Sequence, residues 1–435
     1  MPPTGANIPP APGVQVVNPR CRVPLSFIID DSTCLVNLNK FAIPQFATAW
    51  GSWDRFQQPW REWPNEIPDS FVRKFGEWCA EQDVKGKYSI VPYPALVGRV
   101  DRVLPGWTAQ ELDESLELVR TLMTPNWDIH PEMITHTCVL DTKTGQPYPE
   151  RSLNYQENWE WTVGRSADEL TDYMTYALQI IQNIGLPCEG ITTPGGFAGR
   201  VLDELSIATL DACRAVFQTE IPHYFRHLYS SGEQSVAPRV ENISGLDGPD
   251  PRCVVSIIGC TGDWTGGWDC SSRGDANLFI TPDLQAGRLV DVIERGEPAI
   301  LVCHWTGIYF NGEEVGFQVF QEVVRRLNTK YDHLRWMKLS EIARYWAAKE
   351  CTRITRENGS ITLSAPFATS DFTLEIRPTA GEELKTPRRM QGTEQEQWTE
   401  VSDPLRLTSG TWCRNSDSLT VCFDLPKGET VLRLD

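Results

Sequence analysis

Short apolar runs alternate with longer amphipathic segments over most of the chain. The apolar runs have the length of buried strands and lie at 26–29, 88–91, 132–136, 190–193, 236–243, 253–260, 299–303 and 334–339. The amphipathic segments repeat every three or four residues and predict helices at 68–82, 108–123, 166–185, 200–218, 282–295, 315–327 and 340–348. Strands that alternate with helices indicate a parallel sheet with βαβ crossovers and enough repeats to close a barrel.

The pattern breaks at two places. Residues 37–67 are polar and aromatic, and we expect a long loop there, either functional or a lid. From residue 351 onward the helical period disappears and short alternating runs such as 372–376 and 419–423 take over. This change predicts a small antiparallel, sandwich-like β domain over 351–435, which we expect to brace an α/β domain over 21–350. The Pro-rich residues 1–20 are expected to form a disordered tail.

Composition and charge narrow the functional classes. The chain has 435 residues and a net charge of −18, which argues against nucleic acid or an anionic membrane as the main partner. No apolar run is long enough to span a bilayer, and the N-terminus lacks the features of a secretory signal. Thirteen cysteines without a CxxC pair are typical of reduced thiols. We therefore expect a cytoplasmic protein.

Polar residues follow the predicted strands at their C-terminal ends, where α/β folds place ligand sites. These residues are Asp30, Asp31, Tyr93, His136, Thr193, Asp263 and His304. The two adjacent acids alone could equally cap a loop, but two of the chain's six histidines also end apolar strands, which favours a site. Asp and His side chains bind catalytic zinc or a similar divalent metal. Together with a carboxylate base and a His acid, this composition indicates metal-assisted hydrolysis.

Sixteen tryptophans add a second kind of candidate. Trp53 lies in the aromatic segment over 37–67, and Trp264 and Trp305 follow predicted strands. Tryptophan faces stack on the apolar faces of sugar rings, although tryptophans also fill cores. Their clustering in Gly- and Pro-rich loops favours the binding interpretation.

Four segments resemble the motifs of the NodB-type polysaccharide deacetylases. In chain order they are Ile29-Asp30-Asp31, Thr135-His136-Thr137, Thr192-Thr193-Pro194-Gly195-Gly196 and Leu301-Val302-Cys303-His304. The resemblance covers about residues 24–346 and implies a distorted seven-stranded (β/α) barrel. It also implies Asp30 as the base, Asp31 and His136 as metal ligands, and His304 as the general acid.

Two positions depart from the family's pattern. The second metal-binding His should follow His136 by four residues, but that position is Leu140. The adjacent Asp141 is the candidate replacement, with His304 as another, or the metal has been lost. The Arg of the third motif is replaced by Thr192.

The sequence therefore predicts a metal-dependent hydrolase, with zinc as the expected ion, that removes an acyl group from an oligo- or polysaccharide. The predicted substrate-binding residues are Tyr93, Thr193, Pro194, Gly195, Asp263, Trp264, Trp305 and Trp53. One alternative is a glycoside hydrolase with a carboxylate pair drawn from Asp30, Asp31, Asp141, Asp263 and Glu313. The other is a catalytically inactive glycan-binding protein.

Overall fold

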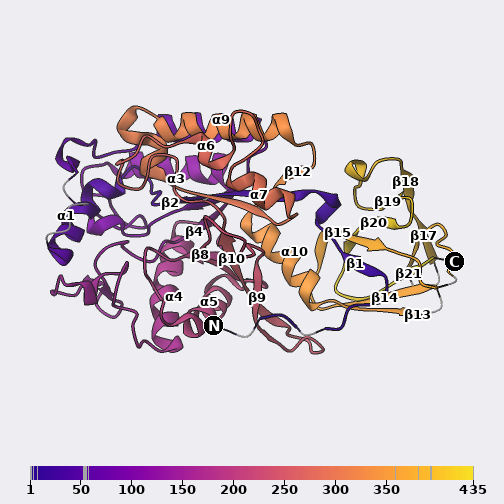
Figure 1. Cartoon of the computed structure of the whole chain (residues 1–435). Coiled ribbons are helices and arrows are strands. Elements are labelled where there is room, and N and C mark those ends of the chain that lie inside the picture. Colours follow the sequence, from indigo (N-terminus) through magenta and orange to yellow (C-terminus); the bar gives the residue numbers. More distant parts are fainter. Residues whose placement is uncertain are drawn as a thin grey trace.

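The computed structural model describes residues 2–434 apart from residues 3, 7, 52–55, 57, 358, 381, 392 and 393. An α/β part occupies the left of Figure 1, and a β part built mainly from the C-terminal residues occupies the right. Helix α10 (Leu339–Cys351) lies between the two parts. The predicted mixed α/β class and the C-terminal antiparallel region are both confirmed.

The first sheet of the α/β part is parallel and is centred on β2 (Val23–Asp30). Its other strands are β11 (Ala299–His304), β3 (Gly86–Ser89), β4 (Trp127–His130) and the short β12 (Leu334–Trp336), which pairs with the start of β2. Every residue of β2 is buried, and the strand has neighbours on both edges. The register sets His304 opposite Asp30, so the acid and the histidine end their strands at the same level.

The second sheet has the order β7 (Gly190–Thr192), β8 (His223–Leu228), β10 (Arg252–Gly259) and β9 (Arg239–Ser244), and only β9 is antiparallel. Two backbone hydrogen bonds link it to the first sheet. Thr192 N–H donates to the Pro131 carbonyl at 3.1 Å, and Cys260 N–H donates to the Ile300 carbonyl at 2.8 Å. Strand pairing among the described residues therefore gives two adjoining sheets, and the closed barrel stays a prediction.

Helices surround these sheets. Their bounds are α1 (Leu38–Trp50), α2 (Asp69–Glu81), α3 (Ala109–Leu118), α4 (Ala167–Asn183), α5 (Leu202–Phe217), α6 (Ala276–Phe279), α7 (Arg288–Glu294), α8 (Trp305–Tyr309) and α9 (Val315–Lys330). Most of the helices predicted from the sequence begin within two residues of the expected start. Capping boxes at Thr108 and Ser166 begin α3 and α4, and each of these side chains accepts the N–H of the glutamate three residues later at 3.2 Å.

Several segments differ from the prediction. Residues 282–287, expected to open a helix, form turns and bends, and α7 begins at Arg288. Strand β8 was not predicted. Residues 38–50 form α1 rather than a loop, because Leu38, Ile43 and Phe46 bury one face despite Pro44 within the helix. Residues 132–136 are irregular, and β4 lies just before them. Their backbone cannot continue the strand, since His136 has a φ of +63° and its N–H binds a glutamate side chain instead of a neighbouring strand.

The β part contains two five-stranded sheets. One has the order β1 (Val14–Val16), β15 (Thr369–Ile376), β20 (Leu419–Leu425), β19 (Thr411–Arg414) and β18 (Thr399–Val401), and the other β13 (Arg353–Glu357), β14 (Ser360–Ala365), β21 (Gly428–Arg433), β16 (Arg388–Gln391) and β17 (Glu394–Gln397). All pairings are antiparallel except β18 with β19. Strand β1 lies within the stretch predicted to be disordered, and it is ordered because Val14–Val16 pair with the edge of β15.

Helix α10 joins the two parts through a shared core. Tyr345 and Trp346 of α10 are buried together with Phe372 and Leu374 of β15. Tyr345 also donates its hydroxyl hydrogen to the Val17 carbonyl at 2.6 Å. All thirteen cysteines are unpaired. Among the described residues, no helix combines the length and apolar character needed to cross a bilayer.

Candidate active site

A pocket of about 220 Å³ lies at the C-terminal ends of strands from both parallel sheets. Its lining residues are Asp30, Asp31, Phe46, Phe56, Glu132, His136, Asn158, Trp159, Thr193, Gly195, Gly196, Trp268 and His304. Charged and titratable side chains share this wall with aromatic ones, so the pocket combines reactive groups with flat apolar surfaces.

Asp31, Glu132 and His136 form one cluster in the pocket, and each is at most 5% exposed. His136 Nε2 lies 2.7 Å from Asp31 Oδ1 and 3.5 Å from Glu132 Oε1. The Asp31 backbone N–H donates to Glu132 Oε2 at 2.8 Å, which ties the end of β2 to the loop after β4. One atom from each of the three side chains lies within 4.8 Å of the other two.

A buried glutamate shapes the loop that carries His136. Both carboxylate oxygens of Glu157 accept backbone N–H groups, at 3.1 Å from Thr135 and at 2.6 Å from His136. Tyr173 donates its hydroxyl hydrogen to the same carboxylate at 2.5 Å. Burial raises the pKa of Glu157 to about 7, against the lowering effect of these donors. The loop therefore owes its shape to a side chain 21 residues further along the chain.

The cluster suits a divalent metal ion. Two carboxylates and one imidazole are ligands that zinc and related ions accept. His136 Nε2 lies 2.7 Å from Asp31 Oδ1, a separation that two ligands of one ion can also have. Asn39 Nδ2 donates to Asp31 Oδ2 at 3.1 Å and orients the carboxylate from behind. The residues present thus fit a metal.

Charge compensation sets the protonation of the same cluster. Burial alone would raise the pKa of Asp31, but His136, His304 and Asn39 outweigh it and hold that pKa well below its usual range. Burial likewise favours a neutral His136, yet Asp31 and Glu132 raise its pKa well above the ordinary value. A positive charge is therefore required between these two carboxylates, and either a proton on His136 or a metal ion supplies it.

Asp30 is paired with a lysine on the neighbouring strand. Lys87 is fully buried and its ammonium group binds Asp30 Oδ1, the Ile29 carbonyl at 3.0 Å and Ser89 Oγ at 2.7 Å. Burial raises the pKa of Asp30 to about 6, and Lys87 and His304 limit the rise. Near neutral pH Asp30 is thus mainly a carboxylate that can accept a proton.

His304 forms the second acid–base pair. Its Nδ1 lies 2.7 Å from Asp263 Oδ2, and its side chain is 23% exposed at the pocket. Burial works against the charged ring, but Asp263 and Asp31 prevail and raise the pKa of His304 to about 10. The ring is therefore protonated at neutral pH, with Nδ1 engaged by Asp263 and Nε2 left as the other proton carrier.

Aromatic side chains supply the remaining wall. Phe46 of α1 packs edge-on against Trp159, with ring centroids 5.0 Å apart, and against Trp268 at 6.1 Å. Phe56 contacts the same two tryptophans. The Trp268 carbonyl accepts hydrogen bonds from Asn39 and from Thr306 Oγ1, so the aromatic wall is tied to the residue that orients Asp31.

The structure brings most of the predicted site residues together. Six of them line the pocket: Asp30, Asp31, His136, Thr193, Gly195 and His304. Asp263 does not line the pocket itself, but it contacts His304, which does. Trp53 lies outside the described residues.

The other predicted residues do not line the pocket: Tyr93, Asp141, Pro194, Trp264 and Trp305. Asp141 belongs to the hairpin of β5 (Leu140–Asp141) and β6 (Gln146–Pro147), where its Oδ1 accepts the Lys143 N–H at 2.9 Å. Trp305 is fully buried in the aromatic core beside Phe71, and Trp264 packs on Phe279. These tryptophans fill space between elements instead of facing a ligand.

Several site residues were not predicted from the sequence, and Glu132 and Lys87 are the charged ones among them. Glu132 completes the cluster, whereas Leu140 stands where the ligand was expected, and Lys87 supplies a buried cation to Asp30. The spacing of four residues between Glu132 and His136 was visible in the sequence. So was Lys87, an isolated charge just before an apolar strand.

The chain shares its overall arrangement only loosely with solved structures. A probable polysaccharide deacetylase from Pseudomonas aeruginosa PAO1 has a TM-score of 0.40 at 12% identity, over 78% of this chain and 95% of that one. Puue allantoinase has a TM-score of 0.38 at 13% identity, over 79% and 96%. The Xyl-CE4 domain of a xylanase from the hindgut metagenome of Trinervitermes trinervoides has a TM-score of 0.31 at 9% identity, over 78% and 98%. No family model and no curated protein matches the sequence.

The Asp30–Lys87 pair generates a stability prediction. Lys87→Met leaves a buried carboxylate without its cation and should lower the free energy of unfolding by about 3–5 kcal/mol at pH 8. Without Lys87 the pKa of Asp30 rises above about 6, so Asp30 is neutral at pH 5 and the loss should be smaller there. Urea unfolding at the two pH values measures the difference.

Lys74→Met is the matched control, because Lys74 forms an exposed ion pair with Glu314 and its removal should cost at most about 1 kcal/mol. Adding Asp30→Asn to Lys87→Met should recover part of the loss at pH 8. Equal losses at pH 5 and pH 8 would contradict the assignment of a charged Asp30.

Proposed function

We propose that this protein is a metal-dependent hydrolase that removes an acyl group from a sugar, and that strands of the two sheets of the α/β part form a distorted seven-stranded barrel around the site. The observation that carries the proposal is the convergence of Asp31, Glu132 and His136 in a pocket that also holds two acid–base pairs. The resemblance of the four sequence motifs to polysaccharide deacetylases supports the same reaction class.

Asp31, Glu132 and His136 would hold the metal, with His136 binding through Nε2. A divalent ion in that position polarises a carbonyl group and lowers the pKa of water. Asn39 keeps the Asp31 carboxylate in place, and Glu157 keeps the His136 loop in place. The chain's own residues therefore determine where the substrate carbonyl must lie.

Asp30 and His304 carry the protons in this proposal. Asp30, held by Lys87, takes a proton from the water that attacks the acyl carbon. Protonated His304, held by Asp263, gives a proton to the sugar nitrogen or oxygen as its bond to the acyl carbon breaks. The products are the free amino or hydroxyl sugar and a carboxylic acid, and both pairs return to their starting protonation when these protons exchange with water.

The aromatic wall supports a carbohydrate substrate. Phe46, Phe56, Trp159 and Trp268 present apolar faces in the same pocket as the charged residues, and aromatic rings stack on the apolar faces of sugars. A volume of about 220 Å³ suits one ring at the reacting position.

The glycosidase alternative finds less support. That mechanism needs two carboxyl groups facing each other across the scissile bond. Here Asp31 and Glu132 lie in one cluster, and Asp30 is bound by Lys87. Asp141 lies in a hairpin, and Glu313 forms an ion pair with Arg273 at 2.9 Å on the surface.

The first test concerns the cluster. Glu132→Gln and Asp31→Ala should each abolish stoichiometric metal binding and lower the release of acetate from acetylated oligosaccharides by at least about 100-fold. Even residues that only orient ligands account for about 10- to 100-fold. Elemental analysis and an acetate assay on the same preparations provide the measurements, and far-UV circular dichroism checks folding.

Asp141→Asn is the matched control, since it alters a carboxylate outside the pocket and should change neither quantity. Sugar binding by the wild type without turnover, unchanged by Glu132→Gln, would overturn the proposal in favour of a glycan-binding protein. Full activity in wild-type protein whose pocket holds no metal would overturn the metal assignment.

The second test uses the pH profile. Asp263 raises the pKa of His304 to about 10, so activity should persist into alkaline pH until His304 loses its proton. In Asp263→Asn the protonated ring loses its main partner and its pKa falls. The alkaline limb of kcat/KM should therefore move to lower pH, with a large loss at pH 9 and a small loss at pH 6. An alkaline limb that stays in place would show that His304 is not the acid.

A further inference from the structure

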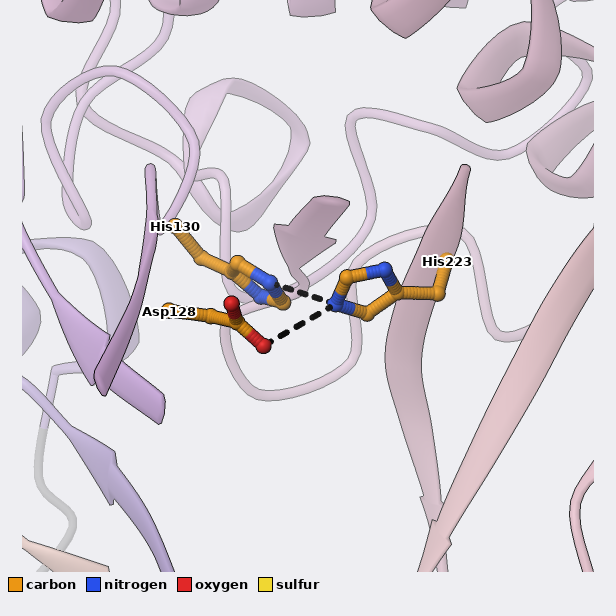
Figure 2. Close-up of side chains that lie close together, drawn as sticks. All are labelled: Asp128, His130 and His223. Atoms are coloured by element: carbon orange, nitrogen blue, oxygen red, sulfur yellow. Dashed lines mark hydrogen bonds and ion pairs between the residues drawn. The ribbon is translucent and has the colours of Figure 1, made fainter. Parts of the chain in front are cut away.

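A second cluster of metal-binding side chains lies outside the pocket, between the two parallel sheets. Figure 2 shows His130 at the end of β4 and His223 at the start of β8, with their rings pointing toward each other and Asp128 beside them. None of the three residues lines the pocket or takes part in the proposed reaction. Both histidines are fully buried, and the Asp128 side chain is 10% exposed.

The ligand atoms of this cluster lie at distances that one ion can bridge. The two Nε2 atoms are 2.9 Å apart, and His223 Nε2 is 3.9 Å from Asp128 Oδ2. All three ligand atoms are within 4.8 Å of one another. Two ligands that bind the same ion at roughly 2.0–2.2 Å can be no more than about 4.4 Å apart, so both measured distances fall within reach.

Neighbouring groups orient the side chains as they do around bound metals. Ser340, at the start of α10, donates its N–H to Asp128 Oδ2 at 2.6 Å and its O–H to Oδ1 at 2.8 Å. His130 Nδ1 lies 3.3 Å from Thr192 Oγ1, which leaves Nε2 facing inward. Such outer partners fix the ring orientation and the tautomer of ligand histidines.

The chain also makes room for this arrangement. A Cβ atom at Gly190 of β7 would lie 2.8 Å from His130 Nε2, so only a glycine there lets the ring take its position.

We propose that Asp128, His130 and His223 bind a first-row divalent transition metal such as zinc as a structural site. The ion ties β4 of the first sheet to β8 of the second. Through Asp128 and Ser340 it also anchors the start of α10, the helix that packs on the β part. Two imidazoles and one carboxylate are ligands typical of zinc and iron(II). This site does not depend on the hydrolase proposal.

Metal counting after a short chelator treatment tests the site. Purified full-length protein loaded with zinc should hold two ions, and brief treatment with EDTA at 20 °C should remove only the ion of the open pocket. His223→Gln should then retain none, and its melting temperature should fall by roughly 5 °C or more. His227→Gln is the matched control on the same strand and should retain the ion. Asp31→Ala should lose the pocket ion alone.

If His223→Gln does not fold, Asp128→Asn serves as the second variant, because it keeps both imidazoles and the side-chain volume. X-ray absorption of chelator-treated, cobalt-loaded wild type should show two imidazole ligands. The site is refuted if treated wild type holds no ion, or if its retained ion is unaffected by both variants. If untreated, zinc-loaded wild type holds one ion that is lost in His223→Gln but kept in Asp31→Ala, the hydrolase proposal alone is refuted.

Discussion

Three carboxylates, those of Asp30, Asp31 and Glu132, are buried together at the ends of β2 and β4, and this concentration of charge governs the site. Each buried carboxylate needs a compensating donor or cation, because an unpaired charge in such surroundings costs several kcal/mol. Lys87 compensates Asp30 from the neighbouring strand. Asp31 and Glu132 share His136, and they leave a position that a divalent cation fits.

The groups that compensate these charges also determine which residue acts as the base and which as the acid. Lys87 and His304 limit the rise in the pKa of Asp30, so that it can act as a base near neutral pH. Asp263 raises the pKa of His304, so that it can act as an acid. The pocket thus holds a base whose pKa lies below neutrality, Asp30, and an acid whose pKa lies above it, His304. A reaction that takes up one proton and gives up another requires such a pair.

The sequence predicted what depends on local pattern. The apolar run before Asp30 and Asp31, the capping boxes at Thr108 and Ser166 and the alternating C-terminal strands all follow from periodicity and short-range hydrogen bonding. The register between β11 and β2 then brings His304 beside Asp30, as parallel neighbours would be expected to lie.

What the sequence missed depends on contacts between distant segments. The loop carrying His136 takes its shape from Glu157. The polar and aromatic composition of residues 37–67 indicated a loop, but the buried face of α1 forms a helix there. Asp141 was the candidate ligand because it is adjacent to Leu140, where the family's second histidine was expected. Asp141 instead lies in a hairpin outside the pocket, and the third member of the cluster is Glu132, four residues before His136. The periodicity of the sequence does not indicate which of these two acids, Glu132 or Asp141, the backbone places in the pocket.

A crystal structure with anomalous diffraction at the zinc edge tests the central claim most directly. The claim predicts a strong peak between Asp31, Glu132 and His136, with all three side chains at about 2.0–2.2 Å from it. A pocket without a peak in zinc-saturated crystals, with His136 Nε2 still in contact with Asp31 Oδ1, would contradict it.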